Sequence, residues 1–306
     1  MQRYIMRRVF YALISLVILS ITIFCLIRFT GDPAILMVEP GASEADLQAI
    51  RQEFGLDKPW VMQYGVFIAN MARGDFGMSI YYREPAFELY LQRLPASLLL
   101  AAVAMSISLL IGIPIGILSA VRVNSWLDTI GKTFSILGLS LPSFWVGLLL
   151  IMIFSVSWGW LPSSGSGTFW HILMPAFSLG WVFSAAYTRM ARSAMLDVLG
   201  SEYIKLARLK GLPEKLVIAK HAFKNAVIPV LTLAGINLVI MMNVAVVVES
   251  VFAWPGIGRL LYEGISNRDF PVVQTTVLMG GMMIVVINLL VDILYAYVDP
   301  RIRYGQ

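Results

Sequence analysis

Six long apolar stretches limit what this 306-residue chain can fold into. Each is close to the roughly 20 residues that a helix needs to cross the hydrocarbon core of a bilayer. Charged residues make up only 13% of the chain, against about 25% in a typical soluble domain. We therefore expect an all-α integral membrane protein with six transmembrane helices, which should run approximately over residues 9–27, 96–121, 133–157, 172–188, 227–248 and 272–297.

The first stretch follows a basic N-terminus, as the apolar segment of a signal peptide does. It is about 19 residues long, which exceeds the 7–15 residues of a typical signal peptide, and no small-x-small cleavage site follows it. We expect a retained first span. Cys25 lies inside this stretch, and a single cysteine excludes a disulfide within the chain.

Lysine and arginine are unevenly distributed between the segments that join the spans. With the N-terminus in the cytoplasm, the inside segments hold 15 basic and 5 acidic residues, and the outside segments and outer helix ends hold 8 and 12. This bias follows the positive-inside rule and predicts an N-in/C-in topology. The basic residues lie between apolar runs and not in patches interleaved with aromatic residues, so we expect no nucleic-acid partner.

Residues 28–95 form the largest segment expected outside. Ser43, with Asp46 three residues later, predicts the start of a helix that Gly55 ends. A second helix should begin near Asp57, with Pro59 in its first turn, and end at Gly74. Both are expected to be amphipathic and to form a small cap lying on the outer membrane face. The apolar stripe of the second helix comprises Trp60, Tyr64, Phe67, Ile68 and Met71.

The chain thus divides into four parts. Residues 1–27 form the cytoplasmic N-terminus and first span, and residues 28–95 form the extracytoplasmic helical insertion. A five-span core follows over 96–297, and it includes a long cytoplasmic loop at 189–226. Residues 298–306 form a cytoplasmic tail.

The sequence lacks the motifs of several enzyme classes. Gly131-Lys132-Thr133 matches the end of a phosphate-binding loop, but Trp126 stands where that loop needs a glycine. His171 and His221 fall on opposite sides of the membrane in the predicted topology, so they cannot share a metal ion. An intramembrane hydrolase using Ser166 and His171 is disfavoured, because both lie in a short polar loop at the outer surface.

Polar residues inside the spans are candidates for a translocation path. Asn237 and Asn243 lie in the fifth span, with Glu249 near its outer end. Groups of this kind can be functional, or they can fix helix packing by hydrogen bonds. No chain of carboxylates crosses the bilayer, which makes an ion-coupled secondary transporter the weaker alternative.

Small residues and prolines indicate close helix packing and bending. Gly112-x-x-x-Gly116 predicts a close helix–helix contact in the second span. Pro114 and Pro142 should bend the second and third spans. Bent helices suit a path that opens and closes.

The segment 189–229 is the strongest candidate functional feature. Ser201 can cap a short helix, Gly211 provides its left-handed stop, and Pro213 opens a second short helix. We expect a docking surface in this segment, because a solvated connector would not need its apolar residues, which are Tyr203, Leu206, Leu216, Val217 and Ile218.

This loop resembles the coupling loop of ABC-importer permeases, and it is most similar to the branch that imports dipeptides, oligopeptides, nickel chelates and glutathione. The resemblance is carried by Tyr203-x-x-x-Ala207-Arg208-x-Lys210-Gly211 and by His221-Ala222-x-x-Asn225-Ala226-x-x-Pro229. The general motif Glu-Ala-Ala-x-x-x-Gly is matched only at Ala207 and Gly211, and the spacing to Pro229 is longer. Both departures are similar to the peptide branch.

The likeness extends over essentially the whole chain. Its further motifs are Gly31-Asp32-Pro33, Gly55-Leu56-Asp57-x-Pro59, Gly74-Asp75-Phe76-Gly77-x-Ser79, Glu249-Ser250-Val251-Phe252-x-Trp254-Pro255-Gly256-x-Gly258, Asn288-Leu289-x-Val291-Asp292 and Asp299-Pro300-Arg301. Together they are specific to the family and not to a substrate.

The resemblance implies a multi-pass permease subunit of the bacterial inner membrane that forms half of the path for a peptide or peptide-like solute. It implies a second homologous permease, two ABC ATPase subunits and an extracytoplasmic solute-binding protein as partners. ATP and Mg would be bound by the ATPases, with no cofactor on this chain. The residues expected to couple to the ATPase are Tyr203, Ala207, Arg208, Lys210, Gly211, Leu216, His221 and Asn225.

Overall fold

The computed structural model describes residues 2–30, 43–53 and 55–298. Over these residues the regular elements are helices, apart from one isolated bridge between Met78 and Pro85. The helices are α1 (Gln2–Thr30), α3 (Glu44–Glu53), α4 (Trp60–Ala72), α5 (Ala86–Val121), α6 (Trp126–Ser140), α7 (Ser143–Leu150), the π-helical η1 (Ile151–Ser157), α8 (Phe169–Leu199), α9 (Glu202–Leu209), α10 (Glu214–Leu216), the π-helical η2 (Val217–Ala222), α11 (Phe223–Val251), α12 (Ile257–Ser266) and α13 (Phe270–Val298).

The described chain holds five helices that are long and apolar enough to cross a membrane, or six if one bent pair is a single span. The bent pair is α6 with α7–η1, which meet at an angle of 102°. The extended conformations of Leu141 and Pro142 end α6 and precede α7. The expectation of an all-helical membrane chain is therefore confirmed. The third stretch is broken at Pro142, whereas α5 continues through Pro114 without interruption.

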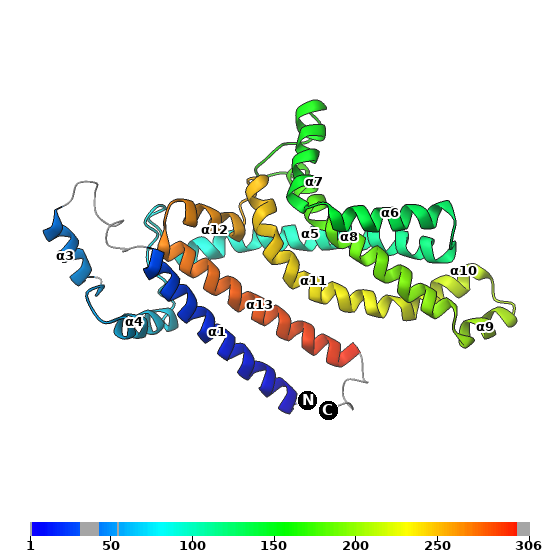
Figure 1. The fold of residues 1–306 in the computed structure, drawn as a ribbon, viewed down its shortest axis with the longest axis horizontal. Coiled ribbons are helices and arrows are strands. Elements are labelled where there is room, and N and C mark those ends of the chain that lie inside the picture. Colours follow the sequence, from blue (N-terminus) through cyan, green and yellow to red (C-terminus); the bar gives the residue numbers. More distant parts are fainter. Residues whose placement is uncertain (1, 31–42, 54, 299–306) are drawn as a thin grey trace. The chain divides into compact units, whose positions relative to one another are not determined.

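The structure consists of two units, of which the first comprises 1–95 and 256–306. In this unit α1 and α13 lie side by side and run in opposite directions (Figure 1). Ile23 and Ile27 of α1 pack with Leu278 of α13, and Leu19 contacts the backbone of Gly281. A side chain at Gly281 would displace the tip of the Leu19 side chain.

The predicted helix-start signal at Ser43 is confirmed. The Ser43 Oγ and backbone N–H both donate to Asp46 Oδ2, at 2.7 and 2.9 Å, and the Asp46 N–H donates to Ser43 Oγ. These hydrogen bonds lower the pKa of Asp46. Gly55 and Gly74 have positive φ and follow α3 and α4, as predicted. Phe54, also expected on the first helix, lies outside the described residues.

A buried carboxylate holds the loop after α4 against the start of α13. Asp269 is fully buried, and its Oδ2 accepts hydrogen bonds from Ser79 Oγ and from the Tyr81 N–H. Nearby, Tyr82 Oη donates to Glu263 Oε2 at 2.6 Å. Burial, together with this bond to a carboxylate, raises the pKa of Tyr82 to about 12. The hydroxyl therefore remains a donor at physiological pH.

The second unit comprises residues 96–255 and is organised around α8, which packs against α6, α7 and α11. The predicted glycine contact is confirmed, because α5 lies directly on α8 at Gly112 and Gly116. A Cβ added at Gly112 would lie 2.6 Å from the Ser184 carbonyl oxygen, and one at Gly116 would lie 2.6 Å from that of Thr188. The two backbones can approach this closely only because both positions are glycine.

A buried charge network joins α5, α6 and α8. Asp128 is fully buried and accepts two hydrogen bonds from the Arg192 guanidinium, at 2.7 and 3.1 Å. It also accepts from Ser119 Oγ at 2.5 Å and lies 2.8 Å from Lys132 Nζ. A buried charge is stable only when it is paired and hydrogen-bonded. This network therefore fixes the turn between α5 and α6 on the flank of α8.

Candidate functional site

Helix α9 is the central element of the predicted docking segment. Ser201 occupies its N-cap position, as predicted, but its hydroxyl donates to the Val198 carbonyl at 2.5 Å and caps no helical N–H. The side-chain cap expected at Ser201 is therefore wrong. Glu202 in the first turn and Arg208 in the last suit the helix dipole.

Gly211 forms the turn after α9. Its φ of +78° lies in the left-handed region, which side-chain-bearing residues avoid, and its N–H donates to the Arg208 carbonyl. Arg208 bridges the turn with two hydrogen bonds to Glu214, at 2.6 and 3.1 Å. The turn is therefore fixed by backbone conformation and by a two-point ion pair.

The second short helix expected after Pro213 is not a separate element. Pro213 precedes α10, but α10 continues through η2 into α11, and the whole run Glu214–Val251 is continuous. The cause is that Leu216, Val217 and Phe223 keep right-handed helical backbone angles at every junction. The part of the candidate docking segment after Pro213 is thus the extended end of a long apolar helix.

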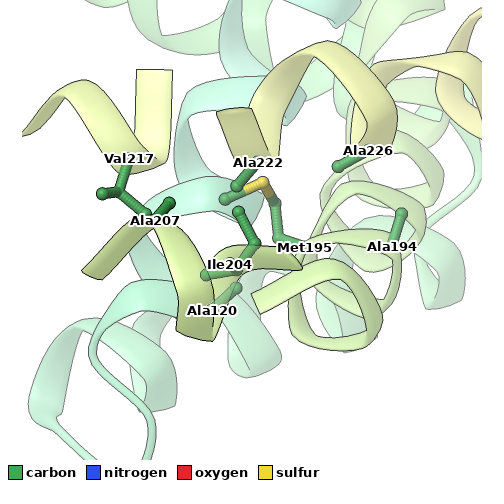
Figure 2. Packing of buried hydrophobic residues seen from close by; sticks show 8 residues of the cluster. All are labelled: Ala120, Ala194, Met195, Ile204, Ala207, Val217, Ala222 and Ala226. Atoms are coloured by element: carbon green, nitrogen blue, oxygen red, sulfur yellow. The ribbon is translucent and has the colours of Figure 1, made fainter. Parts of the chain in front are cut away.

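A small apolar core attaches α9 to the helices below it (Figure 2). Ile204 and Val217 are fully buried, and Ala207 is nearly so. Figure 2 shows the side chain of Ile204 beside those of Met195 and Ala222, and that of Val217 beside Ala207. The cluster consists of Ala120, Ala194, Met195, Ile204, Ala207, Val217, Ala222 and Ala226. It connects α5, α8, α9, η2 and α11, so a displacement of α9 acts on three long helices.

Three of the predicted site residues meet on one side of this core. Asn225 Nδ2 donates to Tyr203 Oη at 2.7 Å, and both groups lie 3.5 Å from the His221 carbonyl oxygen. Tyr203 comes from α9, His221 from η2 and Asn225 from α11. These bonds hold α9 to the end of α11.

The outer side of α9 carries exposed apolar residues beside the exposed ion pair of Glu202 with Lys205. Leu206 and Leu209 are 52% and 84% exposed, and Tyr203 is 42% exposed. Tyr203, Leu206 and Leu209 recur at intervals of three residues along α9, and Leu209 lies on the side opposite Ile204 and Ala207. An exposed apolar face of this kind indicates a contact with another macromolecule.

The structure revises the list of docking residues. Val217 is fully buried in the core and cannot belong to an outer face. Leu209 was missed by the sequence argument, although the helical period of Leu206 and Leu209 could have identified it. Lys210 and Leu216 are exposed beside the turn, as an outer surface requires.

The polar residues predicted in the fifth span do not come together. Asn237 and Glu249 are buried, whereas Asn243 is exposed and donates to the Val239 carbonyl in its own helix. Glu249 accepts a hydrogen bond from Ser97 Oγ at 2.6 Å. Asn243 is thus the one of the three that reaches the surface of this chain.

A cavity of about 280 Å³ lies in the second unit. Its lining offers no polar side chain for hydrogen bonding to a solute. The lining residues are Ile107, Leu150, Phe154, Leu161, Leu173, Met174 and Phe177.

Comparisons with known proteins agree with the family likeness. Residues 112–304 match the model of the binding-protein-dependent transport system inner membrane component, and residues 1–101 match its N-terminal counterpart. Glutathione transport system permease proteins are similar over the whole chain. That of Pectobacterium atrosepticum is 40% identical, and that of Escherichia coli strain K12 is 38% identical, each over 99% of this chain and 100% of the relative.

Solved structures share the fold. An inward-facing conformation of the MetNI methionine ABC transporter superposes with a TM-score of 0.56 at 19% identity, covering 69% of this chain and 96% of the other. An amino acid ABC transporter crystallised with histidines gives a TM-score of 0.54 at 16% identity, covering 69% and 94%.

Proposed function

Since the chain belongs to the family of inner membrane components of binding-protein-dependent transport systems, we propose that its α9 is the helix that contacts an ATPase subunit. The chain is a permease subunit of an ABC importer, and through α9 the ATPase would change the conformation of the permease. The observation that carries this proposal is the apolar outer face of α9, mounted on a core that connects α5, α8 and α11.

The coupling residues have two roles in this proposal. Tyr203, Leu206 and Leu209 contact the ATPase, and Lys210 and Leu216 extend the contact beside the turn. The others hold the geometry: Ala207 in the core, Arg208 and Gly211 at the turn, and His221 and Asn225 under Tyr203. ATP and Mg belong to the ATPase subunits, and this chain supplies no cofactor.

The ATPase would act by shifting the equilibrium between two arrangements of the helices that form the translocation path. A partner can shift such an equilibrium only if it contacts the two states unequally. ATP-dependent closure of the two ATPases would move α9, and the core beneath it would carry that movement into α5, α8 and α11. A second, homologous permease supplies the other half of the path.

The topology of this proposal is six spans, with both termini in the cytoplasm and α6 with α7–η1 counted as the third span. Two observations support it. The 15 basic residues of the inside segments outnumber the 8 outside, and α1 and α13 are antiparallel neighbours (Figure 1). Segment 28–95 and the solute-binding protein are then on the outer side.

The docking proposal is tested by Leu209→Glu in the complex of the permease with its own ATPase subunits. Leu209 is 84% exposed and has no part in the core, so the chain should fold and insert normally. We expect loss of ATPase co-purification and of ATP-driven uptake. Val123→Glu is the matched control, because Val123 is an exposed apolar residue elsewhere on the proposed cytoplasmic side. Unchanged uptake with Leu209→Glu would contradict the proposal.

The solute is proposed to be a small peptide or peptide-like compound, since the full-length relatives are named for glutathione transport. Uptake of labelled dipeptides, tripeptides and glutathione should disappear from cells that lack this chain. Uptake that persists without ATP but follows an ion gradient would instead favour a secondary transporter.

Within the path, Asn243 is the preferred solute-facing residue, with Asn237 and Glu249 behind it. An exposed amide in a membrane helix is costly against lipid, which favours a position facing water or another protein. Asn243→Leu should change uptake while ATPase assembly is retained. Normal uptake of every tested solute would remove Asn243 from the path.

A further inference from the structure

Helix α4 is apolar on both of its faces. Its inner face packs against α1 and α13 through Tyr64, Phe67 and Met71. The opposite face is exposed, with Val61 85%, Met62 55% and Val66 50% accessible. No charged residue occurs between Trp60 and Ala72. The sequence led us to expect an amphipathic helix, and this expectation is wrong for α4, because the exposed face is not polar.

The contacts of α4 place it beside the membrane-crossing part of α1. Tyr64 Oη lies 2.8 Å from Ser20 Oγ, and the Phe24 ring packs against those of Tyr64 and Phe67. Ser20 is nine residues before Phe29, the last residue of the candidate span. At 1.5 Å per residue, that is about 14 Å along the helix axis, close to half the thickness of a hydrocarbon core. The Tyr64 side chain thus reaches toward the bilayer centre.

Polar groups mark the two ends of the helix. Asp57 and Lys58 precede α4, and Arg73 and Asp75 follow it, all of them exposed. Trp60, at the first turn, packs edge-to-face on Phe29 at the end of the α1 span, where aromatic residues favour the membrane interface. An apolar helix of 13 residues is too short to span a bilayer and is typical of a re-entrant or interfacial segment.

We propose that α4 is embedded in the outer leaflet beside α1, with Val61, Met62 and Val66 in contact with lipid acyl chains. The exposed face continues the lipid-facing surface of α1, where Val17 and Ile18 are 53% and 59% exposed. Burial in hydrocarbon removes apolar area from water, worth about 25 cal/mol per Å². The inference rests on the spanning role of α1 in the proposed function. It places α4 below the membrane surface and not on top of it.

The test uses nitroxide labels in the complete complex, reconstituted in lipid nanodiscs, with Cys25 replaced by alanine. Single cysteines at Val61, Met62 and Val66 report collisions with oxygen, which enters lipid, and with a nickel chelate, which stays in water. Ile18 on α1 is the lipid reference. Gln48, an exposed residue of the polar helix α3, is the aqueous reference.

We expect the labels on α4 to collide with the nickel chelate as rarely as the label at Ile18 does, and with oxygen as often. Nickel access at the level of Gln48 would overturn the inference, since the face would then be in water. Low access to both reagents would also overturn it, because another protein would cover the face. If the label at Ile18 collides freely with the nickel chelate, α1 does not span the membrane, and the proposed topology is wrong. This outcome therefore distinguishes a failure of the proposed topology from a failure of the inference about α4.

Discussion

Asp128 shows how much depends on a single side chain in this molecule. Its carboxylate is fully buried and is held by Arg192, Lys132 and Ser119. The first of these partners lies 64 residues further along the chain. Without the carboxylate, the turn between α5 and α6 would lose its ion pair with α8 and keep only the hydrogen bond from Arg192 to Ser119 and the packing of the helices.

Asp128→Asn should destabilise the protein. The change removes a charge and leaves the Arg192 guanidinium without its partner, and hydrogen bonds to charged groups are worth about 1.5–3 kcal/mol each. We expect a clearly lower midpoint of thermal unfolding in detergent. Glu202→Gln is the control, because the Glu202–Lys205 pair is exposed and such pairs contribute little. Equal midpoints for the two variants would show that the Asp128 network carries no stability.

Gly211 is constrained by backbone conformation and not by space. A Cβ there would meet no atom within 4 Å, but φ is +78°. Gly211→Val should therefore reduce coupled uptake, since a β-branched residue is strained in the left-handed region. Gly211→Asn should retain more activity, because asparagine tolerates that region. The matched control is Gly200→Ala, where φ is −79°. Full uptake with valine would exclude a conformational role.

At the scale of elements, the closest contact in the second unit is that of α5 with α8. Gly112→Ala should push the two helices apart, because the added Cβ would lie 2.6 Å from the Ser184 carbonyl oxygen. Overpacking of this kind costs about 1–3 kcal/mol. Gly280→Ala, where no atom lies within 4 Å, should leave the unfolding midpoint unchanged. If the unfolding midpoint falls equally in both variants, the loss of stability is not due to the close contact of α5 with α8.

Local rules predicted several elements correctly. The Ser43–Asp46 cap, the stops at Gly55 and Gly74 and the turn at Gly211 each depend on residues within one turn of each other. The sequence predicted a bend at Pro142 but not a break of 102°, and it did not reveal the continuity of α10 with α11. A proline can kink, break or begin a helix, and packing decides between these outcomes.

The candidate site was predictable in the same measure. Its residues lie on one short helix and the start of another, so the sequence located the surface. The apolar residues that indicated this surface include the buried Val217 and omit the exposed Leu209, because apolar character alone does not tell a buried face from an exposed one. Helical period distinguishes the two faces once the start of α9 at Glu202 is known.

At the scale of the whole molecule, the two ends of the chain and α9 are proposed to be on the same side of the membrane. In a Cys25→Ala background, a cysteine at Gln48 should react with an impermeant maleimide applied from outside. A cysteine at Lys210 should react only in inverted vesicles. The reverse pattern would contradict the N-in topology. Both residues are exposed in this chain, so failure of either to react in the absence of the ATPase subunits cannot be attributed to burial.

The uninterrupted run from Glu214 to Val251 has a mechanical consequence. Its 38 residues would form a rod about 57 Å long as a straight α-helix, and η2 and the internal Pro229 modify that shape. A tilt of only about 5° about one end of this rod displaces the other by roughly 5 Å, which is about one helical turn. A movement too small to disturb the grip of the ATPase would thus be amplified across the bilayer. In the proposed mechanism, α9 receives the movement and passes it through the shared apolar core to the end of this long helix.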